Sequence, residues 1–140
     1  MYVWHALLGY WGGVQPCQPT EAGPLDRYQS TLVFPIHSAG VLLNQPNLAE
    51  DSLTVTGVGV VPPSEIAAFY DAMHAYLAEV GVDGVKVDAQ SIVETLGAGY
   101  GGRVRLAKAY HEALEKSVAK NFPDNGVIAC MSHHTDSLYS

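Results

Sequence analysis

The sequence predicts an α/β protein in which parallel strands alternate with helices. Three short apolar segments predict strands, and two longer amphipathic segments between them predict helices. This order gives a parallel sheet with right-handed crossovers. None of the three strands alternates cleanly between apolar and polar residues, which predicts a sheet covered on both faces. The pattern fits either an open doubly wound sheet or a (β/α)8 barrel, although no glycine fingerprint of a dinucleotide-binding unit follows any strand.

The first strand begins the chain, and a long irregular segment follows it. Met1–Leu8 is rich in aromatic and β-branched residues, as buried strands are. Glycines and prolines interrupt residues 9–63, where only 53–61 has the propensity of a strand, weakened by two glycines. So long an irregular connection is unusual unless it has a function. A chain that begins inside a core strand also predicts a piece of a longer protein.

The first helix is expected to follow Ser64, which has an N-cap side chain, and to end at Gly81. Apolar residues recur along it at steps of three and four, which defines one buried face. The residues of that face are Ile66, Phe69, Tyr70, Met73, Tyr76, Leu77 and Val80. His74 is predicted to lie on the surface of this helix.

The second strand, residues 81–88, carries the pair on which the functional prediction depends. Lys86 and Asp88 are two residues apart, so a strand projects both to the same side. A Lys and an Asp at the carboxyl end of a parallel strand stand where α/β folds place their chemistry. A simple salt bridge at a strand end is the alternative interpretation.

A glycine-rich stretch, residues 97–102, precedes the second helix. It matches neither nucleotide-binding fingerprint and no strand runs directly into it, so we expect a turn. A short helix is expected before it, at 89–96. The second long helix, 103–121, stops at the Pro-Asp-Asn-Gly sequence of 123–126. Its inner face is formed by Leu106, Tyr110, Ala113, Leu114, Ser117 and Val118.

The third strand, 127–131, completes a set of strand ends that should meet at one edge of the sheet. The side chains expected at this edge are Trp4, His5, Trp11, Lys86, Asp88, Ser132, His133, His134 and Asp136. An aromatic ring covers the apolar face of a pyranose, and charged groups hydrogen-bond its hydroxyls, so this set predicts a sugar site. Cys130 and the two adjacent histidines do not predict a metal site, because neighbouring histidines point in different directions and no third ligand has suitable spacing.

Composition limits the class of protein. The chain has 140 residues, enough for one domain spanning residues 1–140, and its hydrophobic content of 48% with 15% charged residues predicts an ordered core. A net charge of −7 without any basic run gives no basis for binding nucleic acid or an anionic membrane. Cys17 and Cys130 make neither a disulfide framework nor a zinc site. No apolar run has the length of a membrane span, and the first residues lack the features of a signal peptide.

Several separated motifs carry a recognisable pattern across essentially the whole chain. They are Tyr2–Leu7 with Gly9–Gly13, Gly81–Asp88, Gly101–Val104 with Leu106–Ala107, and Asn125–Ile128. Together they resemble the raffinose synthase and seed imbibition protein family, the plant-type branch of the α-galactosidase clan. The ending, Cys130–His133 with Thr135-Asp136 and Leu138–Ser140, is more similar to the seed imbibition members, the alkaline α-galactosidases, than to raffinose synthase.

This resemblance implies part of a (β/α)8 TIM barrel, about three of its eight strands, that hydrolyses or transfers α-linked galactose with retention. It implies a galactosyl oligosaccharide or galactinol as substrate, no cofactor, and Asp88 as the nucleophile. Trp4 matches the tryptophan that lines the galactose subsite, Ser132 lies where relatives contact the sugar, and His134 replaces a common Asn. A retaining glycosidase needs an ionised carboxylate about 5–5.5 Å from a protonated one. Lys86 favours the charged form and can donate to sugar hydroxyls.

The resemblance also defines what this stretch lacks. The family's acid/base aspartate belongs to an Asp-Asp-Phe motif on a later strand, beyond Ser140, and neither Glu94 nor Asp136 matches it. Residues 1–140 alone are therefore expected to be catalytically incompetent. Two alternatives to the galactosidase segment are a truncated or divergent pseudoenzyme, and a different barrel chemistry with Lys86 as a Schiff-base amine. The expected compartment is the cytoplasm or a plastid.

Overall fold

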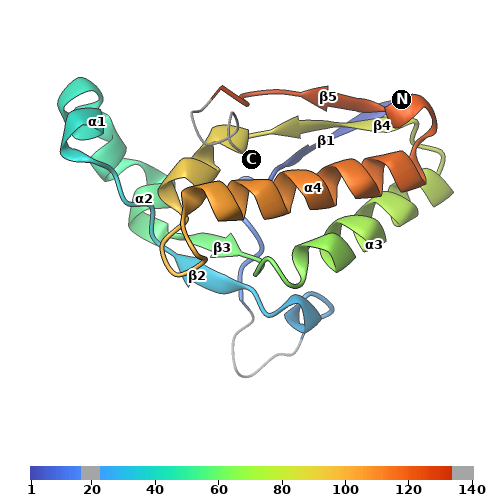
Figure 1. The fold of residues 1–140 in the computed structure, drawn as a ribbon, viewed down its shortest axis with the longest axis horizontal. Coiled ribbons are helices and arrows are strands. Elements are labelled where there is room, and N and C mark those ends of the chain that lie inside the picture. The colour runs from blue at the N-terminus through green and yellow to red at the C-terminus, as the bar shows by residue number, and fades with distance from the viewer. Residues whose placement is uncertain (17–22, 134–140) are drawn as a thin grey trace.

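A computed structural model describes residues 1–16 and 23–133 of the chain. Its centre is a parallel sheet in the order β1–β4–β5 (Figure 1), formed by β1 (Tyr2–Ala6), β4 (Gly84–Asp88) and β5 (Val127–Ala129). The predicted strand segments are present, but all three are shorter than predicted. β1 ends at Ala6 because a tight turn brings the N–H of Gly9 to the carbonyl of Ala6, 2.9 Å away.

The two long helices, α3 (Ile66–Glu79) and α4 (Arg103–Asn121), pack side by side on one face of this sheet (Figure 1). Val85 and Val87 of β4 project to that face and are fully buried. The predicted inner face of the second helix is confirmed, because all six of its residues are buried in α4. Neither these helices nor any other in the described part of the chain is long and apolar enough to cross a membrane.

The prediction for the first helix is wrong in three details. α3 begins at Ile66, and no side chain caps its amino end, so Ser64 is not its N-cap. Tyr76 and Val80 are predicted to face inward, but Tyr76 is 64% exposed and Val80 is 55% exposed. His74, predicted on the surface, is completely buried. His74 is buried because the centre of the packed face runs in four-residue steps from Ile66 through Tyr70 to His74. Tyr76 and Val80 lie away from that line.

The connection between β1 and α3 is more ordered than its glycines and prolines predict. β2 (Thr31–Val33) and β3 (Val58–Val60) pair antiparallel, and the chain between them forms α1 (Ala39–Asn44) and α2 (Ser52–Thr56). The strand predicted at 53–61 is therefore wrong in its first half. The Asp51 side chain accepts a hydrogen bond from the N–H of Leu53 at 3.0 Å, which starts α2 instead. Short 3-10 helices complete the fold: η1 (Asp26–Tyr28), η2 (Pro46–Glu50), η3 (Gln90–Thr95) and η4 (Pro123–Asn125).

The face of the sheet opposite α3 and α4 is largely open. Tyr2, Trp4 and Ile128 project to this face and are exposed, and Lys86 is half-buried between them. The prediction of a sheet covered on both faces is therefore wrong within the described residues. Side chains on this face belong to alternate positions of β1, β4 and β5, which is why they form one surface.

A close backbone contact fixes the loop after β1 to β3. The N–H of Val14 donates to the carbonyl of Gly59 at 2.9 Å, and the N–H of Gly59 donates to Gly12 at 3.0 Å. A Cβ on Gly59 would lie 2.0 Å from the carbonyl oxygen of Val14. We expect Gly59→Ala to lower the free energy of unfolding by about 1–3 kcal/mol, because backbone must move to admit the methyl group. Urea unfolding measures this.

The matched control for this prediction is Gly40→Ala in α1, where an added Cβ would meet no atom within 4 Å. This variant should gain up to about 1 kcal/mol, since alanine is the better helix former. Equal unfolding midpoints for the two variants would show that the Gly59 contact is not tight in solution.

Candidate active site

Asp88 is the last residue of β4, and its backbone is fixed on both sides. Its carbonyl accepts a hydrogen bond from the N–H of Leu7 at 2.9 Å, which continues the ladder to β1. Its side chain is only 9% exposed, and Oδ1 accepts from the N–H of Ala89 at 2.9 Å. Within the described residues Oδ2 has no hydrogen-bond partner. The carboxylate is therefore held by one oxygen, while the other has its lone pairs available.

The residue after this carboxylate has an unusual backbone. Ala89 has φ of 52° and ψ of 36°, the left-handed region that non-glycine residues seldom adopt. This conformation turns the chain sharply from β4 into η3 and brings the Ala89 N–H onto Oδ1 of Asp88. Such strain persists where surrounding structure holds it, and it is concentrated at functional sites. No sequence signal identifies it, because an alanine gives no indication of positive φ.

Lys86 lies on the same face of the sheet as Asp88, as its spacing predicts. Its Nζ lies 3.5 Å from the centre of the Trp4 ring. The two residues are direct neighbours on adjacent strands, because Trp4 of β1 pairs with Lys86 of β4. No ion pair joins Lys86 to Asp88 in the described part of the chain. The salt-bridge interpretation is therefore wrong there, and the ammonium is held by an aromatic face, a contact worth about 0.5–2 kcal/mol.

Two further predicted site residues lie in loops that leave the same edge of the sheet. Trp11 is 47% exposed in the turn after β1. Ser132 follows β5 and is half-buried, beside a hydrogen bond of 2.9 Å from the N–H of Ser91 to the carbonyl of Met131. That bond ties the segment after β5 to the turn after β4. The open face of the sheet therefore carries an aromatic ring and an ammonium group, and its carboxyl edge carries the Asp88 carboxylate and the loops with Trp11 and Ser132.

Comparison with known proteins decides the family of the chain. The family model described as raffinose synthase or seed imbibition protein Sip1 matches residues 1–140. The chain belongs to the raffinose synthase and seed imbibition protein family. The resemblance seen in its motifs is thereby confirmed.

Similar members of the raffinose synthase family come from plants. The chain is 54% identical over 140 residues to the probable galactinol--sucrose galactosyltransferase 1 of Arabidopsis thaliana, and 48% identical over 138 residues to the galactinol--sucrose galactosyltransferase of Pisum sativum. It is 45% identical over 140 residues to the stachyose synthase of Pisum sativum. These matches cover 97–100% of the chain but only 16–18% of the relatives. The chain thus spans less than a fifth of their length.

His5, predicted at the sugar-binding edge, lies on the other face of the sheet. It is 5% exposed beneath α3, with Nε2 3.1 Å from Nε2 of His74. The prediction for this residue is corrected for a simple reason: His5 is one position from Trp4, and successive side chains of a strand project to opposite faces. In this member of the raffinose synthase family, Trp4 and His5 therefore have separate environments.

The buried histidines form a directed chain of hydrogen bonds. His5 Nδ1 lies 2.7 Å from the carbonyl of Ala6, which only accepts, so Nδ1 carries the proton and Nε2 is an acceptor. His74 must then donate from Nε2 to His5, which leaves its Nδ1 to accept from the Ser117 hydroxyl at 2.8 Å. Both rings are neutral in this arrangement. Sequence reasoning missed the pair, because its partners come from β1, α3 and α4.

Burial and mutual repulsion oppose protonation of this pair. Burial, followed by the neighbouring His5, lowers the pKa of His74 to about 4, although the Asp71 carboxylate opposes the shift. Burial also lowers the pKa of His5, against the effect of its hydrogen bond to Ala6. A proton added to His5 would go to Nε2 and place two N–H donors against each other at the contact between the two Nε2 atoms. A proton added to His74 would go to Nδ1, where it would end the hydrogen bond that the Ser117 hydroxyl donates. The pair therefore stays neutral near pH 7.

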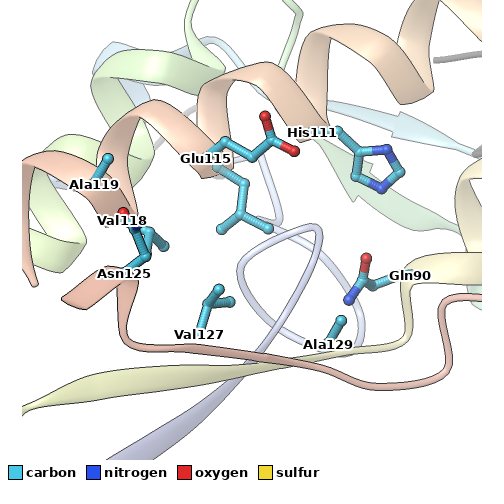
Figure 2. Close-up of a pocket in the computed structure, with 9 residues that line it drawn as sticks. Gln90, His111, Glu115, Val118, Ala119, Asn125, Val127 and Ala129 are labelled. Carbon is cyan, nitrogen blue, oxygen red and sulfur yellow. The ribbon is translucent and has the colours of Figure 1, made fainter.

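A cavity of about 410 Å³ lies on the helix face, between α4 and β5 (Figure 2). His111 and Glu115 of α4 line one side, Val127 and Ala129 of β5 the other, and Gln90 closes one end. The side chains of β5 that line it share their face with Val85 and Val87, whereas Asp88 projects to the opposite face. This cavity is therefore separate from the candidate active site.

Some predicted residues lie outside the described part of the chain. They are Cys17, His134 and Asp136. Among the residues that are described, no three His, Cys, Asp or Glu side chains come together in a group that could hold a metal ion. Glu94 lies in η3 and is half-buried. The candidate site therefore consists of the carboxylate of Asp88, the ammonium of Lys86 and the two tryptophans.

Proposed function

We propose that the protein containing this chain transfers α-linked galactose with retention, from galactinol to a sugar acceptor or to water, with Asp88 as its nucleophile. One observation carries the proposal. Asp88 ends β4 on the same face as Trp4 and Lys86, and one of its oxygens has no hydrogen-bond partner within the described residues. The names of the relatives support the substrates, since they include galactinol--sucrose galactosyltransferases and a stachyose synthase.

In the proposed reaction, Oδ2 of Asp88 attacks the anomeric carbon of the galactosyl group. The new ester bond forms as the bond to the leaving oxygen breaks, and that oxygen takes a proton from an acid outside the described residues. Water or an acceptor hydroxyl then displaces Asp88 and returns the proton to the same acid. Trp4 offers its exposed face to the sugar ring, and Lys86 donates to sugar hydroxyls. Two displacements at one carbon give retention.

The same proposal includes a (β/α)8 barrel as the complete fold. The parallel strands β1, β4 and β5 follow one another along the chain in the same order as they lie in the sheet. The helices that connect them, α3 and α4, both cover one face of the sheet (Figure 1). A barrel needs this arrangement repeated, with its helices outside and the open face turned inward. The exposed Trp4 and Ile128 would then face the barrel interior. The position of the Lys86 Nζ over the Trp4 ring, 3.5 Å from its centre, argues against Lys86 as a Schiff-base amine.

The test is a covalent trapping experiment on the protein expressed from its complete transcript. Galactinol and sucrose should give a trisaccharide, and a fluorinated galactosyl inactivator should add one sugar to the peptide that contains Asp88. Mass spectrometry of the digested protein measures the label. A label on another carboxylate would reject Asp88 as nucleophile, and absence of both turnover and label would favour the pseudoenzyme alternative.

A further inference from the structure

A second hollow lies between the α1–α2 segment and η3. Its volume is about 560 Å³, and a smaller hollow of about 350 Å³ adjoins it and shares His37, Val41, Glu94 and Thr95 with it. The two hollows adjoin at these four residues, and we call them together the lobe groove. A volume of this size is typical of a site for a small organic molecule. Nothing in the motifs of the sequence points to it.

The lobe groove lies at the same edge of the sheet as Asp88. One wall, η3, directly follows β4, and the other wall belongs to the connection that follows β1 (Figure 1). Ser91 lines the groove three residues after Asp88, so the two Cα atoms are at most about 11 Å apart. A hydrogen bond of 3.1 Å from the N–H of Ile36 to the carbonyl of Thr95 joins the walls. The lining of the groove therefore begins close to Asp88 along the chain.

The lining of the groove has the chemistry of a saccharide site. Asn44, Gln45 and Ser91 offer amide and hydroxyl groups for sugar hydroxyls. Val41, Leu48 and Ile92 supply apolar patches for the faces of the rings. Asp51 can accept from hydroxyls, and the charged side chains in the lining of the two hollows, Asp51, Glu94 and Arg103, carry both signs. The occupant that fits this mixture is neutral and rich in hydroxyls.

His37 provides a further reason for a polar occupant. Its Nε2 lies 2.9 Å from the hydroxyl of Thr54, but its Nδ1 is buried with no partner among the described residues. An unpaired buried ring nitrogen costs about 1–3 kcal/mol, and a hydroxyl reaching it would recover part of that cost. The ring belongs to both parts of the groove.

We propose that the lobe groove binds the acceptor saccharide, with sucrose as the simplest occupant, while the transferred galactose lies against Trp4 and Asp88. This inference rests on the proposed function, in which a galactosyl ester at Asp88 meets either water or a sugar. A saccharide held in the groove directs its hydroxyl toward the ester and displaces water. The groove thereby determines how the intermediate divides between transfer and hydrolysis.

The experiment compares two tryptophan substitutions on α1 in the protein expressed from its complete transcript. Val41→Trp fills the groove, since Val41 lines both of its parts. Leu43→Trp is the matched control, because Leu43 is 84% exposed on the same helix and lines neither part. Val41→Trp should raise the KM for sucrose at least tenfold and shift product from trisaccharide to free galactose. Leu43→Trp should match the wild type in both the KM for sucrose and the ratio of the two products.

A direct titration with sucrose, followed by calorimetry or ligand-observed NMR, gives a readout independent of turnover. The wild type and Leu43→Trp should bind sucrose, and Val41→Trp should bind at least tenfold more weakly, with an unchanged thermal midpoint. Equal sucrose affinity and equal partition in the two variants would overturn the groove assignment, even if the wild type is an active transferase. An inactive wild type that still binds sucrose in the groove would instead reject the proposed function alone.

Discussion

Replacing Asp88 by asparagine is expected to lower kcat/KM for galactinol by about 10⁴-fold, equivalent to roughly 5.5 kcal/mol of transition-state stabilisation. The change keeps the size of the side chain and an oxygen that accepts from the N–H of Ala89. It removes the negative charge that forms the galactosyl ester. Steady-state release of the leaving group measures the loss, and an unchanged thermal midpoint shows that the fold is kept.

A small nucleophile offers a sharper test of the same role. In Asp88→Gly, azide should enter the vacated space and attack the anomeric carbon from the side that Asp88 occupied. One displacement inverts the centre, so the expected product is β-galactosyl azide, identified by NMR. A product with retained configuration would contradict the assignment.

The control for both variants is Asp83→Asn at the opposite end of the same strand. Asp83 precedes β4 and is exposed. This substitution should leave turnover within about twofold of the wild type, because the side chain lies at the amino end of the sheet. Equal losses in Asp83→Asn and Asp88→Asn would indicate that damage to β4, and not the loss of a nucleophile, lowers the rate.

The buried histidine pair predicts a loss of stability in mild acid. The pKa of His74 is lowered from 6.5 to about 4 in the folded protein. Between pH 6.5 and pH 4 the unfolded chain therefore binds a proton at this residue that the folded chain does not bind. The associated stability is complete above pH 6.5 and is lost as the pH falls toward 4. His74 alone accounts for about 3 kcal/mol, and the lowered pKa of His5 acts in the same direction. Urea unfolding at pH 7 and pH 4.5 measures the difference.

Titratable side chains of α3 and α4 surround the His5–His74 pair. Tyr70 of α3 stacks on His74, Tyr110 of α4 contacts Tyr70, and the Asp71 carboxylate pairs with Lys120 at 2.8 Å. His74→Phe should lower stability at pH 7, because His5 and Ser117 lose their partner, but it should flatten the dependence between pH 7 and 4.5. His133→Gln, at an exposed position, should leave that dependence as in the wild type. A His74→Phe variant as acid-sensitive as the wild type would show that the pair does not titrate as described.

Much of the framework follows from local pattern. The apolar segments predict β1, β4 and β5, because a strand needs only a few β-branched and aromatic residues in a row. The buried face of α4 follows from the 3.6-residue period of its sequence. The Lys-x-Asp spacing predicts that Lys86 and Asp88 share a face, since alternation is a property of any strand.

The sequence by itself therefore determined the parallel strands, the helix α4, the shared face of Lys86 and Asp88, and, through its motifs, the family. Only the tertiary structure decided that His5 points away from that face and hydrogen-bonds a buried His74, that Lys86 lies over Trp4, and that α1, α2 and η3 enclose a groove. Periodicity reports which residues of one element share a side. It carries no information about which side chain of a distant element will meet them, because that depends on how separately formed elements pack together.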